Sequence, residues 1–108
     1  MARNMFRRSI YKTPAQLRLM REPGLATAAA LEATKGALRA GITPLELDAL
    51  AEAAIRDRGG RPNFMMEPGY RHTICANVNA HVVHAIPTDQ PLRPGDIVAI
   101  DAGAEIGG

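Results

Sequence analysis

Two histidines lie close together in a stretch that otherwise has the pattern of a short buried strand. His81 and His84 flank a pair of valines in NAHVVHAIPTD, residues 79–89. Pro87 must end a strand here, and a side chain at such an end is often exposed to a cleft. His84 is therefore a candidate for chemistry, although a single histidine in an apolar stretch is more often a structural residue. Strand alternation would point the two imidazoles to opposite faces, so they cannot share a metal site unless the strand bulges.

A single carboxylate interrupts one of the most apolar segments of the chain. Asp101 follows Ile97-Val98-Ala99-Ile100, and a buried carboxylate without a partner is energetically costly. One interpretation is a metal ligand or a catalytic carboxylate that a strand holds rigidly. The other is a structural aspartate bonded to a backbone turn or an arginine, which is the commoner case for an isolated acidic residue. Asp101 alone does not decide between them.

Threonine–proline pairs mark the starts of two helices. Thr13-Pro14-Ala15-Gln16 and Thr43-Pro44-Leu45-Glu46 each place a threonine before proline, with Gln or Glu three residues after the threonine. Both sequences predict capping boxes. An apolar stripe follows the second one, so we predict a helix over 44–58 that ends at the left-handed pair Gly59-Gly60.

Pro23 interrupts the segment that follows the first capping box. Proline lacks the N–H that a helix needs, and its ring clashes with the preceding turn. We therefore predict a short first turn or two, a kink at Pro23, and then a helix over about 24–40 that ends at Gly41.

In the second half of the chain the apolar period changes from that of a helix to that of a strand. Thr73–Val78 alternates and predicts a strand. We predict a second short strand over Val82–His84 and a third over Ile97–Ala104. Between these two, Pro94 and Gly95 suit the central positions of a type II turn.

Length and composition set broad limits on the protein. The chain has 108 residues, of which 46% are apolar and 22% charged, which allows one compact core and argues against global disorder. Cys75 is the only cysteine, so no intrachain disulfide can form. No apolar run approaches the roughly 18 residues of a membrane span, and no signal-peptide pattern follows the start. We expect a cytoplasmic protein.

Residues 1–12 form a basic arm. The net charge of the chain is only +2, but every charged residue before Glu22 is basic: Arg3, Arg7, Arg8, Lys12, Arg18 and Arg21. Such an arm could contact a polyanion such as ribosomal RNA, or act as an organelle transit segment. A solvated, poorly ordered terminus is the commoner alternative.

Motifs in the second half of the chain together point to a known family. HAIP at 84–87 is followed by PGDIVAIDAG at 94–103, and Cys75 and Asn79 precede them in a Cys-x-x-x-Asn pattern. Over about residues 11–108 the chain resembles the N-terminal half of type I methionine aminopeptidases. The resemblance implies an α/β (α+β) fold, namely the N-terminal half of a pita-bread fold with two helices packed on one face of a mainly antiparallel sheet. Residues 13–108 would then form an incomplete catalytic domain.

The resemblance also implies roles for individual residues. Asp101 matches a metal-ligating aspartate in a site for two divalent metal ions, with Co, Mn, Fe or Zn as candidates. His84 matches a catalytic, substrate-binding histidine that contacts the scissile peptide and helps to stabilise the tetrahedral species. Cys75 and Tyr70 match substrate-binding positions that line the pocket for the methionine side chain, whereas His81 matches an apolar position. The implied function is removal of N-terminal methionine from nascent proteins and peptides, by an enzyme that is monomeric when complete.

The same resemblance implies that most of the metal site is missing from these 108 residues. A second aspartate would fall just beyond Gly108, and a histidine and two glutamates lie much farther along in the family. We therefore expect the 108-residue chain alone to be inactive and prone to aggregation, because part of a sheet would be left uncovered.

Several positions depart from the family pattern. Glu67 stands where an aromatic residue is common, Arg71 where proline is usual, and Ala85 replaces the glycine of the commoner HGIP. Two alternatives to the enzyme remain open: a truncated, non-catalytic relative that acts as a binding or ribosome-associated module, and a related proline-type metallopeptidase. The motif at 84–87 favours the methionine branch over the proline-type branch.

Overall fold

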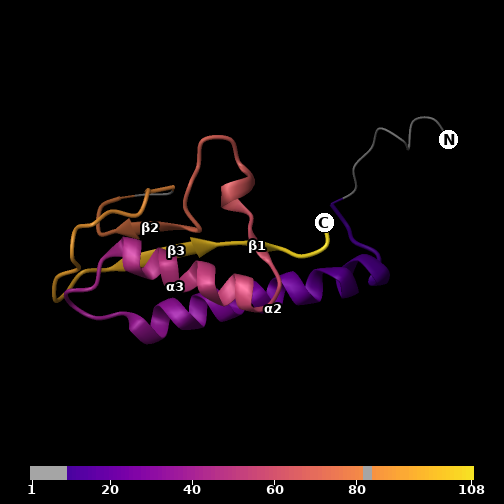
Figure 1. The fold of residues 1–108 in the computed structure, drawn as a ribbon, viewed down its shortest axis with the longest axis horizontal. Coiled ribbons are helices and arrows are strands. Elements are labelled where there is room, and N and C mark those ends of the chain that lie inside the picture. Colours follow the sequence, from indigo (N-terminus) through magenta and orange to yellow (C-terminus); the bar gives the residue numbers. More distant parts are fainter. Residues whose placement is uncertain (1–9, 82–83) are drawn as a thin grey trace.

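The computed structural model describes residues 10–81 and 84–108. In chain order, the elements are the helices α2 (Pro14–Ala37) and α3 (Pro44–Asp57), the strand β1 (Arg61–Pro62), the 3₁₀ helix η1 (Phe64–Met66), and the strands β2 (Ile74–Val78), β3 (Val98–Ala102) and β4 (Ala104–Glu105). Figure 1 shows the two α-helices lying together on one side of the strands, with the loop that carries η1 rising on the other side. Residues 1–9 of the predicted basic arm lie outside the described residues.

Helix α2 begins where the first capping box predicts. The Thr13 hydroxyl accepts a hydrogen bond from the Gln16 N–H at 3.1 Å, and the Gln16 side chain accepts one from the Thr13 N–H at 2.8 Å. The helix then continues through Pro23 to Ala37, so the predicted division into a short first segment and a helix over 24–40 is wrong. Proline removes only one backbone hydrogen bond, and the capped first turn and the packing beyond Pro23 hold the helix on either side of it. That packing comes from a buried stripe of small residues, Ala26, Ala30 and Thr34.

Helix α3 matches the predicted helix over 44–58 to within one residue. The Thr43 hydroxyl accepts from the Glu46 N–H at 3.1 Å, but the reciprocal half of the capping box is absent, since the same hydroxyl donates to the Glu46 carboxylate. At the other end, Gly59 has a left-handed φ of 80°, and the Gly60 N–H donates to the Ile55 carbonyl at 3.0 Å. The predicted glycine-ended helix is therefore confirmed, with the bond pattern of a Schellman motif.

The antiparallel pair of β2 and β3 buries one of its faces against the helices. The register runs from Ile74 opposite Ala102 to Val78 opposite Val98, and directly opposed residues point to the same face. Alternate residues of both strands join the helices in one hydrophobic core, which includes Leu47, Ala51, Ile55, Ile74 and Ala76, with Val98 and Ile100 packed against it. Two helices on one face of antiparallel strands are what the family resemblance implies.

The other face of this strand pair carries the polar residues. It presents Cys75 and Asn77 from β2 and Asp101 from β3. Asp101 is exposed, contrary to the expectation of a buried carboxylate, because both helices pack on the opposite face. The cost of burying a carboxylate without a partner therefore does not arise for Asp101.

The predicted third strand changes its partner along its length. After β3 pairs with β2, Gly103 leads into β4, which pairs with β1 instead. The Gly103 carbonyl accepts from the Asn63 N–H at 3.1 Å, next to the pair of Pro62 and Ala104 in β1 and β4. The segment predicted over 97–104 is thus extended as expected, but it belongs to two small sheets and not to one.

The turn that precedes β3 has the predicted geometry. Pro94 and Gly95 occupy its central positions, and the Asp96 N–H donates to the Arg93 carbonyl at 3.1 Å. Gly95 has a φ of 88°, as the third residue of a type II turn requires.

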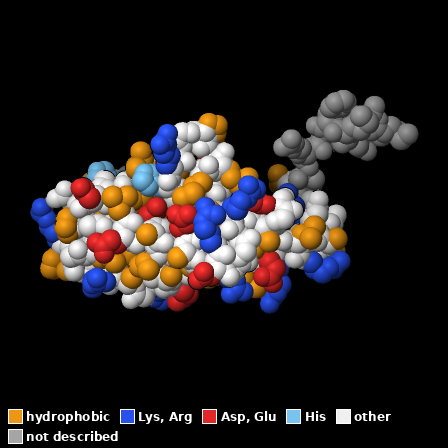
Figure 2. Space-filling model, in the orientation of Figure 1, with side chains coloured by type: hydrophobic (Ala, Val, Ile, Leu, Met, Phe, Trp, Pro, Cys, Tyr) orange, Lys and Arg blue, Asp and Glu red, His pale blue; other side chains and the backbone are white. Residues whose placement is uncertain are grey.

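Charged side chains of both signs are spread over the surface. Figure 2 shows basic and acidic side chains interspersed on the face that it presents, with histidine side chains along its upper edge above β2. Within residues 10–81 and 84–108, neither α-helix has the length and apolar composition needed to span a membrane.

Candidate functional site

The four residues that the sequence assigns to a site line one cavity. Tyr70, Cys75, His84 and Asp101 share a cavity of about 650 Å³. The rest of its lining consists of Asn63, Phe64, Glu67 and Ile86, which the sequence does not assign to the site. The cavity therefore collects residues from the η1 loop, from β2 and β3, and from the segment that follows β2.

The strand register places Cys75 beside Asp101. The two are Cα partners across β2 and β3, so their side chains leave the sheet on the same face. Cys75 is only 4% exposed, whereas Asp101 is open to solvent. One side of the site is thus a buried thiol, and its neighbour is an accessible carboxylate that can accept a cation or a donor group.

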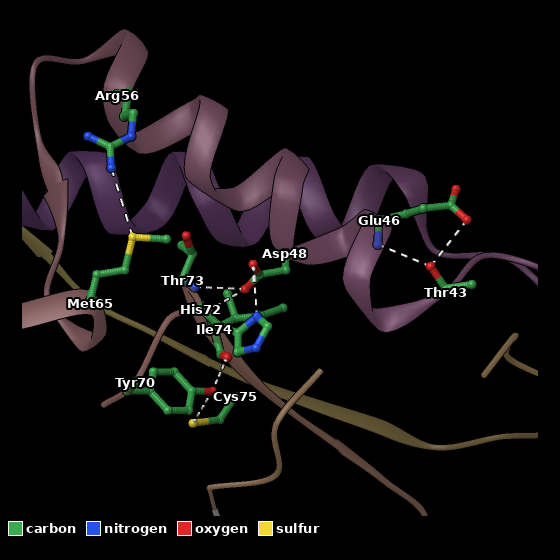
Figure 3. Close-up of polar contacts among 10 residues, drawn as sticks. All are labelled: Thr43, Glu46, Asp48, Arg56, Met65, Tyr70, His72, Thr73, Ile74 and Cys75. Atoms are coloured by element: carbon green, nitrogen blue, oxygen red, sulfur yellow. Dashed lines mark hydrogen bonds and ion pairs between the residues drawn. The ribbon is translucent and has the colours of Figure 1, made fainter. Parts of the chain in front are cut away.

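Tyr70 is fixed against β2 by its hydroxyl group. The hydroxyl donates to the Ile74 carbonyl at 2.6 Å and lies 3.5 Å from the Cys75 sulfur (Figure 3). The ring meets those of Phe64 and His72 edge to face, with centroids 6.1 and 5.6 Å away. Burial raises the pKa of Tyr70, and the hydrogen bond with Cys75 raises it further. Tyr70 is therefore a neutral phenol near neutral pH, with a ring held in one orientation.

His84 stands in a bend, so the strand predicted over Val82–His84 is wrong at this residue; Val82 and Val83 lie outside the described residues. Its φ of 56° lies in the left-handed region, which costs roughly 1–2 kcal/mol for a residue other than glycine. The next residue, Ala85, is bonded to β2 through both its N–H and its carbonyl. The bend allows the exposed His84 side chain to line the cavity that Asp101 also lines.

The prediction that His81 and His84 point to opposite faces is also wrong. Both line a neighbouring cavity of about 680 Å³. Strand β2 ends at Val78, and the chain turns so that the His81 N–H donates to the Val78 carbonyl at 3.2 Å. Strand alternation therefore ends before His81. Only His84 also lines the cavity of Asp101.

Asp48 supports the site from α3 and was missed by the sequence reasoning. Its Oδ1 accepts from the N–H groups of Thr73 and Ile74, each at 2.8 Å, and its Oδ2 lies 3.7 Å from His72 Nδ1. Figure 3 shows the carboxylate reaching from the helix to the start of β2, next to His72 and Thr73. The sequence does contain a signal for this role. Asp48 lies three and seven residues before the buried Ala51 and Ile55, so it is an acidic residue on the apolar face of the helix.

The described residues supply part of a metal-binding set at most. Within residues 10–81 and 84–108 there is no group of three or more His, Cys, Asp or Glu side chains that could hold a metal ion. Asp101 offers one exposed carboxylate, the ligand type that divalent cations accept. The residues present therefore do not complete a metal site by themselves.

The chain is similar to a family of metallopeptidases and to individual methionine aminopeptidases. The sequence profile of Metallopeptidase family M24 matches residues 18–108. Methionine aminopeptidase 1 of Bacillus subtilis is 42% identical over 99 residues, which are 92% of this chain and 40% of that protein. The crystal structure of methionine aminopeptidase from Thermotoga maritima matches with a TM-score of 0.81 and 32% identity, over 86% of this chain and 38% of that chain.

A structure with lower sequence identity is similar to this chain in its fold only. Xaa-Pro dipeptidase from Bacillus anthracis is 22% identical and matches with a TM-score of 0.71, over 86% of this chain and 25% of that chain. The chain described above spans about two fifths of the length of its Bacillus subtilis relative.

Proposed function

Because the chain belongs to Metallopeptidase family M24, we propose that the protein removes N-terminal methionine from nascent proteins and peptides. The observation that carries this proposal is the single cavity lined by Tyr70, Cys75, His84 and Asp101. The 42% identity to a methionine aminopeptidase supports the methionine branch of the family. The motif HAIP at 84–87 supports the same branch over proline-type peptidases.

In this proposal, the cavity receives the methionine side chain and the peptide bond that follows it. Phe64 and Tyr70 offer aromatic edges, and Cys75 offers a buried thiol, which together suit a flexible and polarisable thioether. Since Tyr70 stays neutral, its hydroxyl continues to donate to the Ile74 carbonyl and keeps this wall of the pocket in place.

His84 is the proposed catalytic residue. It lines the cavity and is exposed, so its imidazole can reach the scissile peptide of a bound substrate. A ring N–H that donates to the oxygen on which negative charge develops stabilises the tetrahedral species, and one such donor is worth roughly a hundredfold in rate. Asp101 lines the same cavity and provides an exposed carboxylate there.

We propose that the complete protein uses two divalent metal ions, drawn from Co, Mn, Fe or Zn, with Asp101 as one ligand. Members of Metallopeptidase family M24 are metal-dependent peptidases, and an aspartate carboxylate can bind any of these four ions. The remaining ligands are not among the described residues. Residues 13–108 would then be the N-terminal half of the catalytic domain.

The proposed partner is the N-terminus of a peptide or of a nascent chain. Nascent chains emerge in the cytoplasm, which is where this activity would operate, and the complete enzyme would act as a monomer. The basic arm over residues 1–12 is a candidate for contact with ribosomal RNA.

A non-catalytic binding or ribosome-associated module is the second candidate function. The observation that favours it is the lack of a complete metal-ligand set within residues 10–81 and 84–108. Against it, Asp101 and His84 both face the cavity, where a module without catalytic function would not need either side chain.

Hydrolysis of a short methionyl-alanyl peptide by the complete, metal-loaded protein tests the proposal. His84→Ala is expected to lower kcat by roughly a hundredfold, since it removes the donor to the tetrahedral species. Asp101→Asn is expected to lower both bound metal, measured by elemental analysis, and activity. His81→Ala is the control and should change neither, because His81 does not line the Asp101 cavity.

Two results would contradict the proposal. A His84→Ala protein that keeps the full rate would remove His84 from the catalytic role. Cleavage of dipeptides ending in proline, with no cleavage of methionyl peptides, would instead assign the protein to the proline-type branch.

A further inference from the structure

The left-handed conformation of His84 needs a contact that holds it. Its φ of 56° is unfavourable for a residue with a side chain, and such conformations persist only where the surrounding structure fixes them. Residues 82 and 83 lie outside the described part of the chain, and on the C-terminal side of His84 the neighbouring residue Ala85 is bonded to β2.

Those contacts join Ala85 to β2 by two hydrogen bonds. The Ala76 N–H donates to the Ala85 carbonyl at 3.0 Å, and the Ala85 N–H donates to Asn77 Oδ1 at 2.9 Å. The first bond is made by the backbone and does not depend on the side chain at position 76. The second depends on the side chain of Asn77, so it is the one that this particular sequence provides.

Asn77 is well placed to act as a fixed anchor. It lies within β2, where Ala99 of β3 is its Cα partner, and its side chain shares a face with those of Cys75 and Asp101. An acceptor in this place orients the peptide group between His84 and Ala85, and the orientation of that group determines ψ of His84.

We infer that Asn77 is a positioning residue for His84: its side-chain oxygen fixes the peptide that follows the histidine and so keeps the imidazole in the cavity of Asp101. This inference rests on the catalytic role proposed for His84. Asn77 acts through His84 and does not itself line the cavity.

The chemistry of the side chain makes the inference specific. Asn77→Leu has nearly the same size but no acceptor, so the Ala85 N–H loses its partner. Asn77→Asp keeps an acceptor oxygen in the same place. If the role of Asn77 is to orient His84, the aspartate variant retains function and the leucine variant does not.

The test is a double-mutant cycle in the complete, metal-loaded protein with a methionyl-alanyl peptide as substrate. Asn77→Leu is expected to lower kcat roughly tenfold with little change in KM, because a displaced catalytic group weakens binding of the transition state more than that of the substrate. Asn77→Asp is expected to recover most of the rate. In a His84→Ala background, Asn77→Leu should cause no further loss, because the group that it positions is gone.

Asn79→Ala serves as the matched control. Asn79 also fixes a loop, through bonds with Asp96 and Ile97, but it bonds to neither His84 nor Ala85. Any loss that it causes should multiply with that of His84→Ala, as independent effects do. If Asn77→Leu does not fold, Asn77→Ala removes the same acceptor and takes its place in the cycle.

The possible outcomes separate the inference from the function on which it rests. If His84→Ala is itself without effect, the proposed role of His84 fails and the inference fails with it. If His84→Ala is slow while Asn77→Leu and Asn77→Ala keep the full rate, or if the losses multiply in the double variant, only the inference is overturned. A loss confined to single variants with intact His84, together with recovery in Asn77→Asp, supports it.

Discussion

At the scale of single residues, Asp48 is the side chain that ties α3 to the start of β2. Asp48→Ala is expected to lower the free energy of unfolding by about 2–4 kcal/mol, because two buried N–H groups lose their shared acceptor. Those groups are the amides of Thr73 and Ile74, whose side chains are fully buried. Urea denaturation of the complete protein, followed by circular dichroism, measures the change.

His72→Ala and Asp48→Asn are the controls for this prediction. His72 contacts Asp48 at 3.7 Å and is partly exposed, so its loss should cost less than about 1 kcal/mol. Asp48→Asn keeps one acceptor oxygen and should lie between the two. A value for Asp48→Ala equal to that for His72→Ala would show that the amides of Thr73 and Ile74 find other acceptors.

Residue types were easier to predict than their conformations. The spacing of Cys75, His84 and Asp101 and their family resemblance identified the residues that line one cavity. The left-handed His84 was not predictable, because the valines before it have a strand pattern and the bonds of Ala85 to β2 form only in the folded chain. The exposure of Asp101 likewise depends on which face the helices cover.

At the scale of secondary structure, Pro23 disfavours the helix in which it lies. It lies inside α2, where it removes a helical hydrogen bond and crowds the preceding turn. Pro23→Ala is therefore expected to raise the free energy of unfolding by about 1–3 kcal/mol. Thermal unfolding, followed by the circular dichroism of the helices, would show a higher midpoint.

Pro14→Ala provides the comparison, because Pro14 is exposed and occupies the first turn of α2, where a missing N–H costs nothing. It should leave stability unchanged or slightly reduced. If Pro23→Ala also brought no gain, the restriction that Pro23 places on the unfolded chain would have to offset its cost in the helix.

Elements defined by local signals were predicted, and those defined by distant partners were not. The threonine cap and paired glycines fixed the ends of α3, and Pro94-Gly95 fixed the turn before β3. In contrast, the division of the last extended segment at Gly103 depends on pairing with residues some forty positions earlier in the chain, such as Arg61 opposite Glu105. The periodicity of one segment does not indicate which distant segment will pair with it.

At the scale of the whole molecule, the helices cover one face of the β2–β3 pair, and the other face carries candidate site residues. The helices bury Ile74 and Ala76, and the opposite face presents Cys75 and Asp101. The four candidate site residues thus line one cavity, and no group of three or more His, Cys, Asp or Glu side chains that could hold a metal ion occurs among the described residues.

This arrangement predicts the behaviour of the isolated 108-residue chain. We expect it to show no measurable cleavage of methionyl peptides and only weak binding of Mn²⁺, because a single exposed carboxylate does not provide the several ligands that a tight site requires. Isothermal titration with Mn²⁺, together with the peptide assay, tests this, and Asp101→Asn is the matched variant. Tight, saturable binding that Asp101→Asn abolishes would contradict the prediction. It would mean that Asp101 gains further ligands from residues outside 10–81 and 84–108, or from a second copy of the chain.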